Sequence, residues 1–267
     1  MIKYQTMLIL FSVIAGIIFI LLGLVYWWQE KLIFFPEKVH HTYQYPFRHP
    51  FEEIYIDAPD GSRIHALHFK AHHSRGAILY FHGNAGSLRT WGYLAEELVV
   101  YGYDVFMPDY RSFGKSTGKL SPNTLYHDAQ LTYNYLRQHY SEDQIVIFGR
   151  SIGSGVATKL ASDNKPKLLI LETPFYNFAD VANTHYPFLP VSLLLKYTFR
   201  SDKWIKKVSC PVYILHGTAD VVVPFRSGEK LARLLNNPKS LVVIEGGGHN
   251  NLSSFAAYRR ALAEILK

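Results

Sequence analysis

Residues 145–153 read Ile-Val-Ile-Phe-Gly-Arg-Ser-Ile-Gly, an apolar run that passes directly into a Gly-x-Ser-x-Gly pattern. The apolar run is typical of a buried strand, and the residues after it have a helix-like pattern. A serine at a sharp turn from strand to helix takes a strained backbone conformation, and only glycine-sized neighbours avoid a collision there. The pattern therefore predicts a nucleophile elbow with Ser151 as the nucleophile. The alternative is a turn in which Ser151 only caps the helix.

Two further polar residues follow later in the chain, each just after a β-like run. Asp220 follows the run at residues 212–215, and His249 follows the run at residues 241–245. The carboxyl ends of parallel strands meet at one edge of a sheet, where open α/β sheets bind ligands. We therefore expect His249 to take the proton of Ser151, and Asp220 to orient the imidazole and stabilise the imidazolium. Asp220 as a turn residue and His249 as an ordinary loop histidine are the alternatives.

An earlier loop, His-Gly-Asn-Ala-Gly at residues 82–86, follows the apolar run at residues 77–81. An acyl-transfer transition state places negative charge on the former carbonyl oxygen, so two hydrogen-bond donors must already point at that position. By their positions, the backbone N–H groups of Asn84 and Ile152 are the expected oxyanion hole.

These motifs together resemble those of serine hydrolases with the α/β-hydrolase fold, over a region from about Phe51 to Lys267. The resemblance rests on residues 82–86, 109–118, 149–155, 216–220 and 246–250. More narrowly, the chain is similar to single-pass, membrane-anchored hydrolases, which include bacterial proteins described as serine peptidases and eukaryotic relatives that act on protein acyl groups or lipids. Ser112 departs from the pattern, because many relatives have glycine there.

Strand and helix patterns alternate along the rest of the chain. We expect a hairpin at residues 53–67 that turns at Asp60 and Gly61. Further strands are expected at residues 77–81, 104–107, 145–148, 212–215 and 241–245 and near Leu168, with helices near 88–100, 125–136, after Ser151 and at 253–266. Repeated βα units predict a mostly parallel central sheet with helices on both faces.

One segment, at about residues 174–207, breaks this alternation and is rich in aromatic residues. We expect a short lid that shapes an acyl pocket and excludes water. Ordinary core packing by an extra helix is an equal alternative, because aromatic stripes usually belong to a core. The segment also carries the basic and aromatic residues Arg200, Lys203, Trp204, Lys206 and Lys207. They are expected either to contact anionic lipid headgroups or to form a solvated face.

The chain begins with a long uncharged stretch, Met7 to Trp28, which ends in three aromatic residues. At ~1.5 Å per residue it would extend about 33 Å, enough to cross a bilayer core of about 30 Å. Residues 1–28 are therefore predicted to be an uncleaved transmembrane anchor, since a signal peptide has a shorter apolar region and small residues at its cleavage site. Residues 29–50 form a linker expected to lie on the domain or the membrane interface. Lysines flank the anchor on both sides, so the side of the membrane stays open.

Composition narrows the function. The chain has 267 residues, 48% of them hydrophobic, which fits one catalytic domain, residues 51–267, plus an anchor. The single cysteine, Cys210, excludes an intramolecular disulfide. The sequence has no phosphate loop, dinucleotide-binding glycine pattern or metal-ligand cluster, so we expect no cofactor and no metal. Despite a net charge of +7, no nucleic-acid-binding motif is present and no nucleic-acid partner is expected.

The expected function is hydrolysis of an ester or thioester of an apolar acyl group, or of a lipid-like substrate, at the membrane. An aminopeptidase or other amide hydrolase is the alternative within enzymes, with Glu172 or Glu245 as the group that binds the substrate's amine. A non-catalytic interaction protein on the same fold is the alternative from another class.

Overall fold

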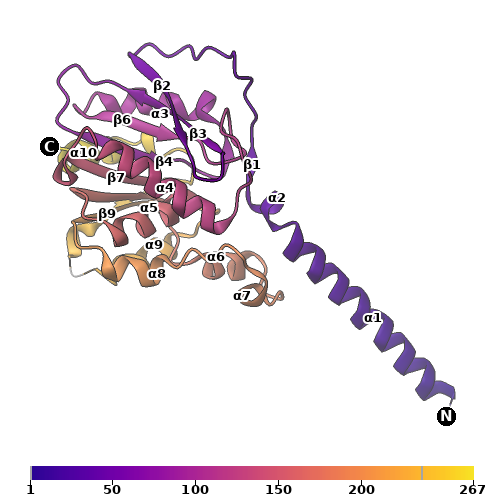
Figure 1. Ribbon diagram of the computed structural model, residues 1–267. Coiled ribbons are helices and arrows are strands. Elements are labelled where there is room, and N and C mark those ends of the chain that lie inside the picture. The colour runs from indigo at the N-terminus through magenta and orange to yellow at the C-terminus, as the bar shows by residue number, and fades with distance from the viewer. Residues whose placement is uncertain (1, 236) are drawn as a thin grey trace.

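The computed structural model describes residues 2–235 and 237–267, whose centre is an eight-stranded sheet with the strand order β10-β9-β8-β7-β4-β6-β3-β2 (Figure 1). The strands are β2 Phe51–Asp57, β3 Arg63–Phe69, β4 Ala77–Phe81, β6 Asp104–Pro108, β7 Ile145–Arg150, β8 Leu168–Glu172, β9 Val212–Gly217 and β10 Leu241–Ile244. β2 and β3 pair antiparallel, β3 joins β6 antiparallel, and all remaining neighbours are parallel. The predicted hairpin and mostly parallel sheet are confirmed.

Helices cover both faces of the sheet, as predicted. They are α3 Leu88–Val99, α4 Pro122–Leu136, α5 Ile152–Asp163, α9 Phe225–Ala232 and α10 Ala256–Ile265. Residues of α4, α5 and α9 share one apolar core with Leu79 and Ile147, whereas residues of α3 and α10 share a second core with Ile78 and Val146. This division follows from the strands, because successive side chains point to opposite faces. The last helix starts at Ala256 rather than residue 253, because Leu252–Ser254 forms a separate 3₁₀ turn.

The N-terminal helix α1, Ile2–Trp27, projects away from the domain (Figure 1). An apolar stretch between Tyr4 and Trp27 has a mean hydropathy of 3.1 and is not buried in the protein, so this helix is long and apolar enough to cross a membrane. A short helix α2, Gln29–Ile33, follows, and strand β1, Phe35–Pro36, pairs in parallel with β5, Ala85–Gly86. The sequence did not predict this pairing, because two-residue strands have no periodic signal.

The segment between β8 and β9 contains α6 Phe178–His185, α7 Val191–Leu194, α8 Ser201–Trp204 and a 3₁₀ turn, Ile205–Lys207. Its two ends belong to the core, where Phe175 and Phe199 are 1% and 0% exposed. Its middle is open to solvent: Phe188, in the loop between α6 and α7, is 97% exposed. The segment thus combines core packing at its ends with an exposed middle over the carboxyl edge of the sheet.

Candidate active site

Ser151 occupies the turn between β7 and α5, with φ 52° and ψ −119°. A positive φ in a residue other than glycine costs of order 1–3 kcal/mol and persists only where the surroundings enforce it. Here the flanking glycines allow the turn. A Cβ atom on Gly153 would collide with the carbonyl oxygen of Phe81, and one on Gly149 would collide with the carbonyl group of Gly153. The predicted elbow geometry is present.

His249 links Ser151 to Asp220 through its two ring nitrogens. Its Nε2 lies 2.9 Å from Ser151 Oγ, and its Nδ1 lies 2.8 Å from Asp220 Oδ2. Because a carboxylate only accepts hydrogen bonds, the ring proton is assigned to Nδ1, whose N–H donates a hydrogen bond to Asp220. The lone pair of Nε2 is then left to accept a hydrogen bond from the Ser151 hydroxyl. The three residues follow β7, β9 and β10, so the parallel strands bring them together at one sheet edge. This arrangement can activate a hydroxyl as a nucleophile.

The Asp220 carboxylate is buried and surrounded by donors. Its Oδ1 accepts the backbone N–H groups of Val222 and Val223, each at 2.9 Å. Burial raises the pKa of Asp220, but hydrogen bonds from His216, His249 and the Val223 amide outweigh it and hold the pKa below its ordinary value. Sequence reasoning missed His216, whose Nε2 lies 3.3 Å from Asp220 Oδ2. Its position four residues before Asp220 was the feature of the sequence that could have indicated this contact.

Asn84 and Ile152 both line the cavity that contains Ser151. Within the described residues the Asn84 N–H has no hydrogen-bond acceptor, and Ile152 is the first residue of α5, where helix N–H groups have no intrahelical partner. The rest of Asn84 is held by the residues that follow α1: its Nδ2 donates to the Ile33 carbonyl at 2.7 Å, and its carbonyl accepts the Phe35 N–H at 2.8 Å. Both amides are therefore free to serve a ligand beside Ser151.

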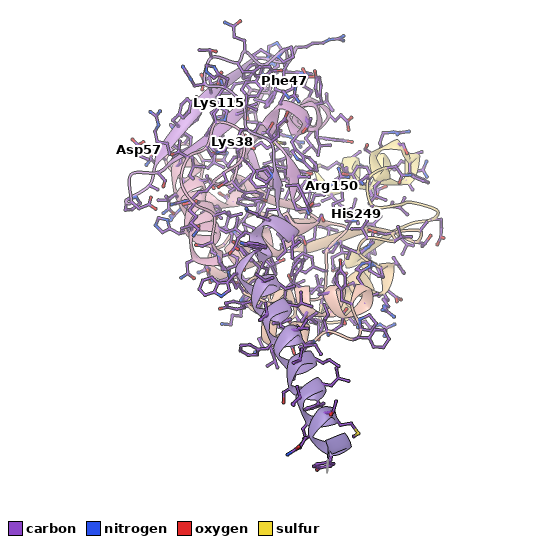
Figure 2. The ribbon with its side chains drawn as sticks, turned by 90° about the vertical axis from the view of Figure 1, so that its right-hand side faces the viewer. Lys38, Phe47, Asp57, Lys115, Arg150 and His249 are labelled. Atoms are coloured by element: carbon purple, nitrogen blue, oxygen red, sulfur yellow. The ribbon has the colours of Figure 1, made fainter. Side chains whose placement is uncertain are left out.

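A buried network supports the histidine loop from behind. Arg150 Nε lies 3.2 Å from Glu172 Oε1, and the Tyr258 hydroxyl donates to Glu172 Oε2 at 2.7 Å. Arg150 also donates to the His249 carbonyl oxygen at 3.1 Å, and the two residues lie side by side in Figure 2. Glu172 is 2% exposed and fully engaged, and Glu245 is exposed and accepts from Thr218. Neither glutamate lines the cavity, so neither is placed to bind a substrate's amine.

The cavity at Ser151 has a volume of about 540 Å³ and a mostly apolar lining. Its walls come from the start of α5, from the segment between β8 and β9 (the expected lid segment, residues 174–207), from Val222 and Val223, and from the end of α1 together with α2. No Asp or Glu of the described chain lines it. Nor do residues 2–235 and 237–267 contain a group of three or more His, Cys, Asp or Glu able to hold a metal ion.

The fold is that of α/β-hydrolases, and the chain belongs to that family. The profile of the alpha/beta hydrolase fold matches residues 76–171. The chain is 33% identical over 228 residues to the uncharacterized protein Rv2307c of Mycobacterium tuberculosis, a match that covers 84% of this chain and 81% of the relative.

Two further comparisons are with a lipase and with an esterase structure. The chain is 36% identical over 193 residues to the lysophosphatidylserine lipase ABHD12 of Danio rerio, which covers 63% of this chain but only 49% of that relative. The solved structure of the Pyrococcus furiosus esterase Pf2001 superposes with a TM-score of 0.68 at 20% identity, covering 87% of this chain and 96% of that one. At that identity the likeness shows the fold alone.

Proposed function

We propose that this protein is a membrane-anchored serine hydrolase that cleaves esters or thioesters of apolar acyl groups. The observation that carries the proposal is the hydrogen-bonded chain from Ser151 through His249 to Asp220, whose Ser151 end lines a mainly apolar cavity. The family membership supports hydrolysis, and the lysophosphatidylserine lipase relative supports an acyl substrate.

In the proposed reaction, Ser151 Oγ attacks the acyl carbonyl carbon while its proton passes to His249 Nε2. The oxygen of the tetrahedral intermediate takes the negative charge and accepts hydrogen bonds from the Asn84 and Ile152 amides. The carbon–oxygen or carbon–sulfur bond then breaks, and His249 protonates the leaving alcohol or thiol. Water, deprotonated by the same histidine, attacks the acyl-enzyme; the bond to Ser151 Oγ then breaks, His249 returns the proton to Oγ, and the acid is released. Asp220 stays ionised and stabilises the imidazolium in both halves.

The cavity favours an acyl group over a peptide amine. An aminopeptidase needs a carboxylate to hold the substrate's ammonium group, and no Asp or Glu among the described residues lines this cavity. An alkyl chain, by contrast, gains about 0.8 kcal/mol for each CH₂ it buries there.

Helix α1 is the proposed membrane anchor. Its apolar stretch from Tyr4 to Trp27, 24 residues long, would span about 36 Å at ~1.5 Å per residue, more than a bilayer core of about 30 Å. Trp27 and Trp28 are 71% and 58% exposed at its domain end, where indole rings favour the membrane interface.

The test uses the full chain in phospholipid vesicles and a fluorophosphonate probe, which forms a covalent bond only with an activated serine. We expect the wild type to be labelled and Ser151→Ala to be unlabelled, while Ser162→Ala, a control on helix α5, keeps wild-type labelling. Unlabelled wild type, or labelling that survives in Ser151→Ala, would contradict the proposal and favour a binding protein. Nitrophenyl esters should react faster than aminoacyl anilides; the reverse order would make the protein an amide hydrolase.

A further inference from the structure

The cavity at Ser151 has one wall that comes from outside the catalytic domain. Val25 lies near the end of α1, and Gln29, Leu32 and Ile33 belong to α2; all four line the cavity. The lid segment contributes further apolar residues, among them Leu189 and Leu194. The helix proposed to cross the membrane therefore ends as part of the substrate-binding surface.

A buried amide joins this wall to the lid. Gln29 is only 3% exposed, although glutamine is usually found at the surface. Its Nε2 donates to the Leu194 carbonyl at 2.8 Å, and its Oε1 accepts the Lys196 N–H at 2.7 Å. An amide buried in this way holds α2 against α7, because separating the two helices would leave the donor and the acceptor of Gln29 unpaired.

A charged side chain reinforces the same junction. Lys196 Nζ lies 4.8 Å from the centre of the Tyr26 ring, 5.6 Å from that of Trp27 and 3.5 Å from Glu30 Oε1. Helix α7 contacts α1, and Figure 1 shows the two beside each other on the same side of the domain. The lid is thus fastened to the end of the anchor.

The other end of α2 holds the loop that carries Asn84. The Ile33 carbonyl accepts from the Asn84 side chain at 2.7 Å, and β1 continues into its pairing with β5. Helix α2 therefore lies between the lid segment and the loop that carries Asn84. Residues of the lid segment and Asn84 line the same cavity as Ser151. Exposed apolar side chains surround this region: Leu32 is 59%, Phe188 97% and Leu193 82% exposed.

From this geometry we infer that the substrate is an acyl ester of a bilayer lipid, whose acyl chain lies against Val25 and Leu32 and extends from the leaflet to Ser151. The inference rests on the proposed function and adds the substrate class and the wall that selects it. A chain that passes from lipid tails to an apolar wall never has to enter water, so the large cost of hydrating it is avoided. Val25 and Leu32 are the specificity-determining residues.

The test compares two fluorogenic esters, methylumbelliferyl acetate and methylumbelliferyl palmitate, on the full chain in phosphatidylcholine vesicles that contain the palmitate. Val25→Trp places a larger side chain in the cavity, where it would occupy the space proposed for the acyl chain. We expect it to lower the palmitate-to-acetate ratio of kcat/KM about 10-fold or more, since a hydrophobic pocket discriminates by this amount when its volume changes. Val13→Trp, at an exposed position of the same helix, is the matched control and should keep the wild-type ratio.

Fluorophosphonate labelling shows whether each variant has folded, and Leu32→Trp replaces Val25→Trp if that variant is not labelled. An unchanged ratio in a labelled Val25→Trp or Leu32→Trp variant would overturn the inference while leaving the proposed function intact. Hydrolysis of both esters that persists in Ser151→Ala would instead overturn the proposed function. A fall of equal size in Val13→Trp would also overturn the inference, because the effect would then come from the membrane and not from the wall.

Discussion

Asp220 shows how a single carboxylate is kept ionised in a buried position. Donors reach both of its oxygens: the Val222 and Val223 amides at Oδ1, and His249 at Oδ2. These hydrogen bonds more than offset the cost of burial, so the pKa lies below its ordinary value. The negative charge is then present at neutral pH, and it is available to stabilise an imidazolium at His249 in the proposed reaction.

Replacement of Asp220 by asparagine is expected to lower kcat for methylumbelliferyl acetate about 10³- to 10⁴-fold. The amide removes the negative charge, and its own N–H can face Nδ1, which favours the tautomer with the proton on Nε2. That tautomer cannot accept the proton of Ser151. Steady-state kinetics measure the effect, with Asp143→Asn, at an exposed 3₁₀ turn, as a control at wild-type rate. An Asp220→Asn enzyme within about 10-fold of wild type would show that His249 acts without this carboxylate.

Gly83 lies just before the proposed oxyanion donor Asn84. A Cβ atom at this position would lie 3.1 Å from the Trp91 ring, which is itself fixed by a 2.8 Å hydrogen bond to the Ala85 carbonyl. We expect Gly83→Val to shift the loop and lower kcat about 10²-fold, the effect of losing one oxyanion donor, with a smaller change in KM. Gly83→Ala, which adds only the Cβ, should lose less. Wild-type turnover in Gly83→Val would remove Asn84 from the proposed oxyanion hole.

At the scale of elements, the pairing of β1 with β5 connects the segment that follows α1 and α2 to the candidate site. Phe35 donates its backbone N–H to the Asn84 carbonyl at 2.8 Å, and Glu37 donates to Gly86 at 2.9 Å. Phe35→Pro removes the first of these donors, since proline has no N–H. It should lower kcat for the acetate ester about 10-fold by loosening the loop. Phe35→Ala keeps the N–H and removes only a half-exposed ring, so equal losses in both variants would contradict a role for the backbone bond.

The same elements show what the sequence could predict. Short apolar runs marked most of the long strands, and the polar residues placed after β7, β9 and β10 did meet at one edge. The pairing of β1 with β5 and the amide of Gln29 on the lid were not predictable, because contacts between segments so distant in sequence leave no periodic pattern. The sequence could not decide whether the lid segment is a lid or part of the core, and the reason is physical. Phe175 is buried and Phe188 is exposed, and aromatic content alone does not separate buried from exposed rings.

For the whole molecule, ionisable groups on both edges of the sheet make stability depend on pH. Asp104, at the amino end of β6, is buried, which raises its pKa, yet hydrogen bonds from His68, Tyr140 and the Ala71 amide hold the pKa below its ordinary value. Asp220, at the opposite edge, behaves in the same way. Burial also lowers the pKa of His65, whose ring is 0% exposed. In all three cases the unfolded chain binds protons more readily than the folded protein as the pH falls.

The free energy of unfolding should therefore decrease in two stages on acidification. The pKa of His65 is lower in the folded protein than the ordinary value of 6.5. As the pH drops below that value the unfolded chain takes up the proton first, so the contribution of His65 to the free energy of unfolding decreases. A depressed carboxyl pKa acts likewise below the ordinary value of 3.8, so Asp104 and Asp220 make the second decrease steeper. Urea midpoints of the full chain in detergent, measured from about pH 7 to about pH 3, follow both stages.

Asp104→Asn should flatten the second stage, because an amide does not titrate. Asp57→Asn, at an exposed strand end, is the control and should keep the wild-type slope. Equal slopes in wild type and Asp104→Asn would mean that this buried carboxylate does not drive the acid transition.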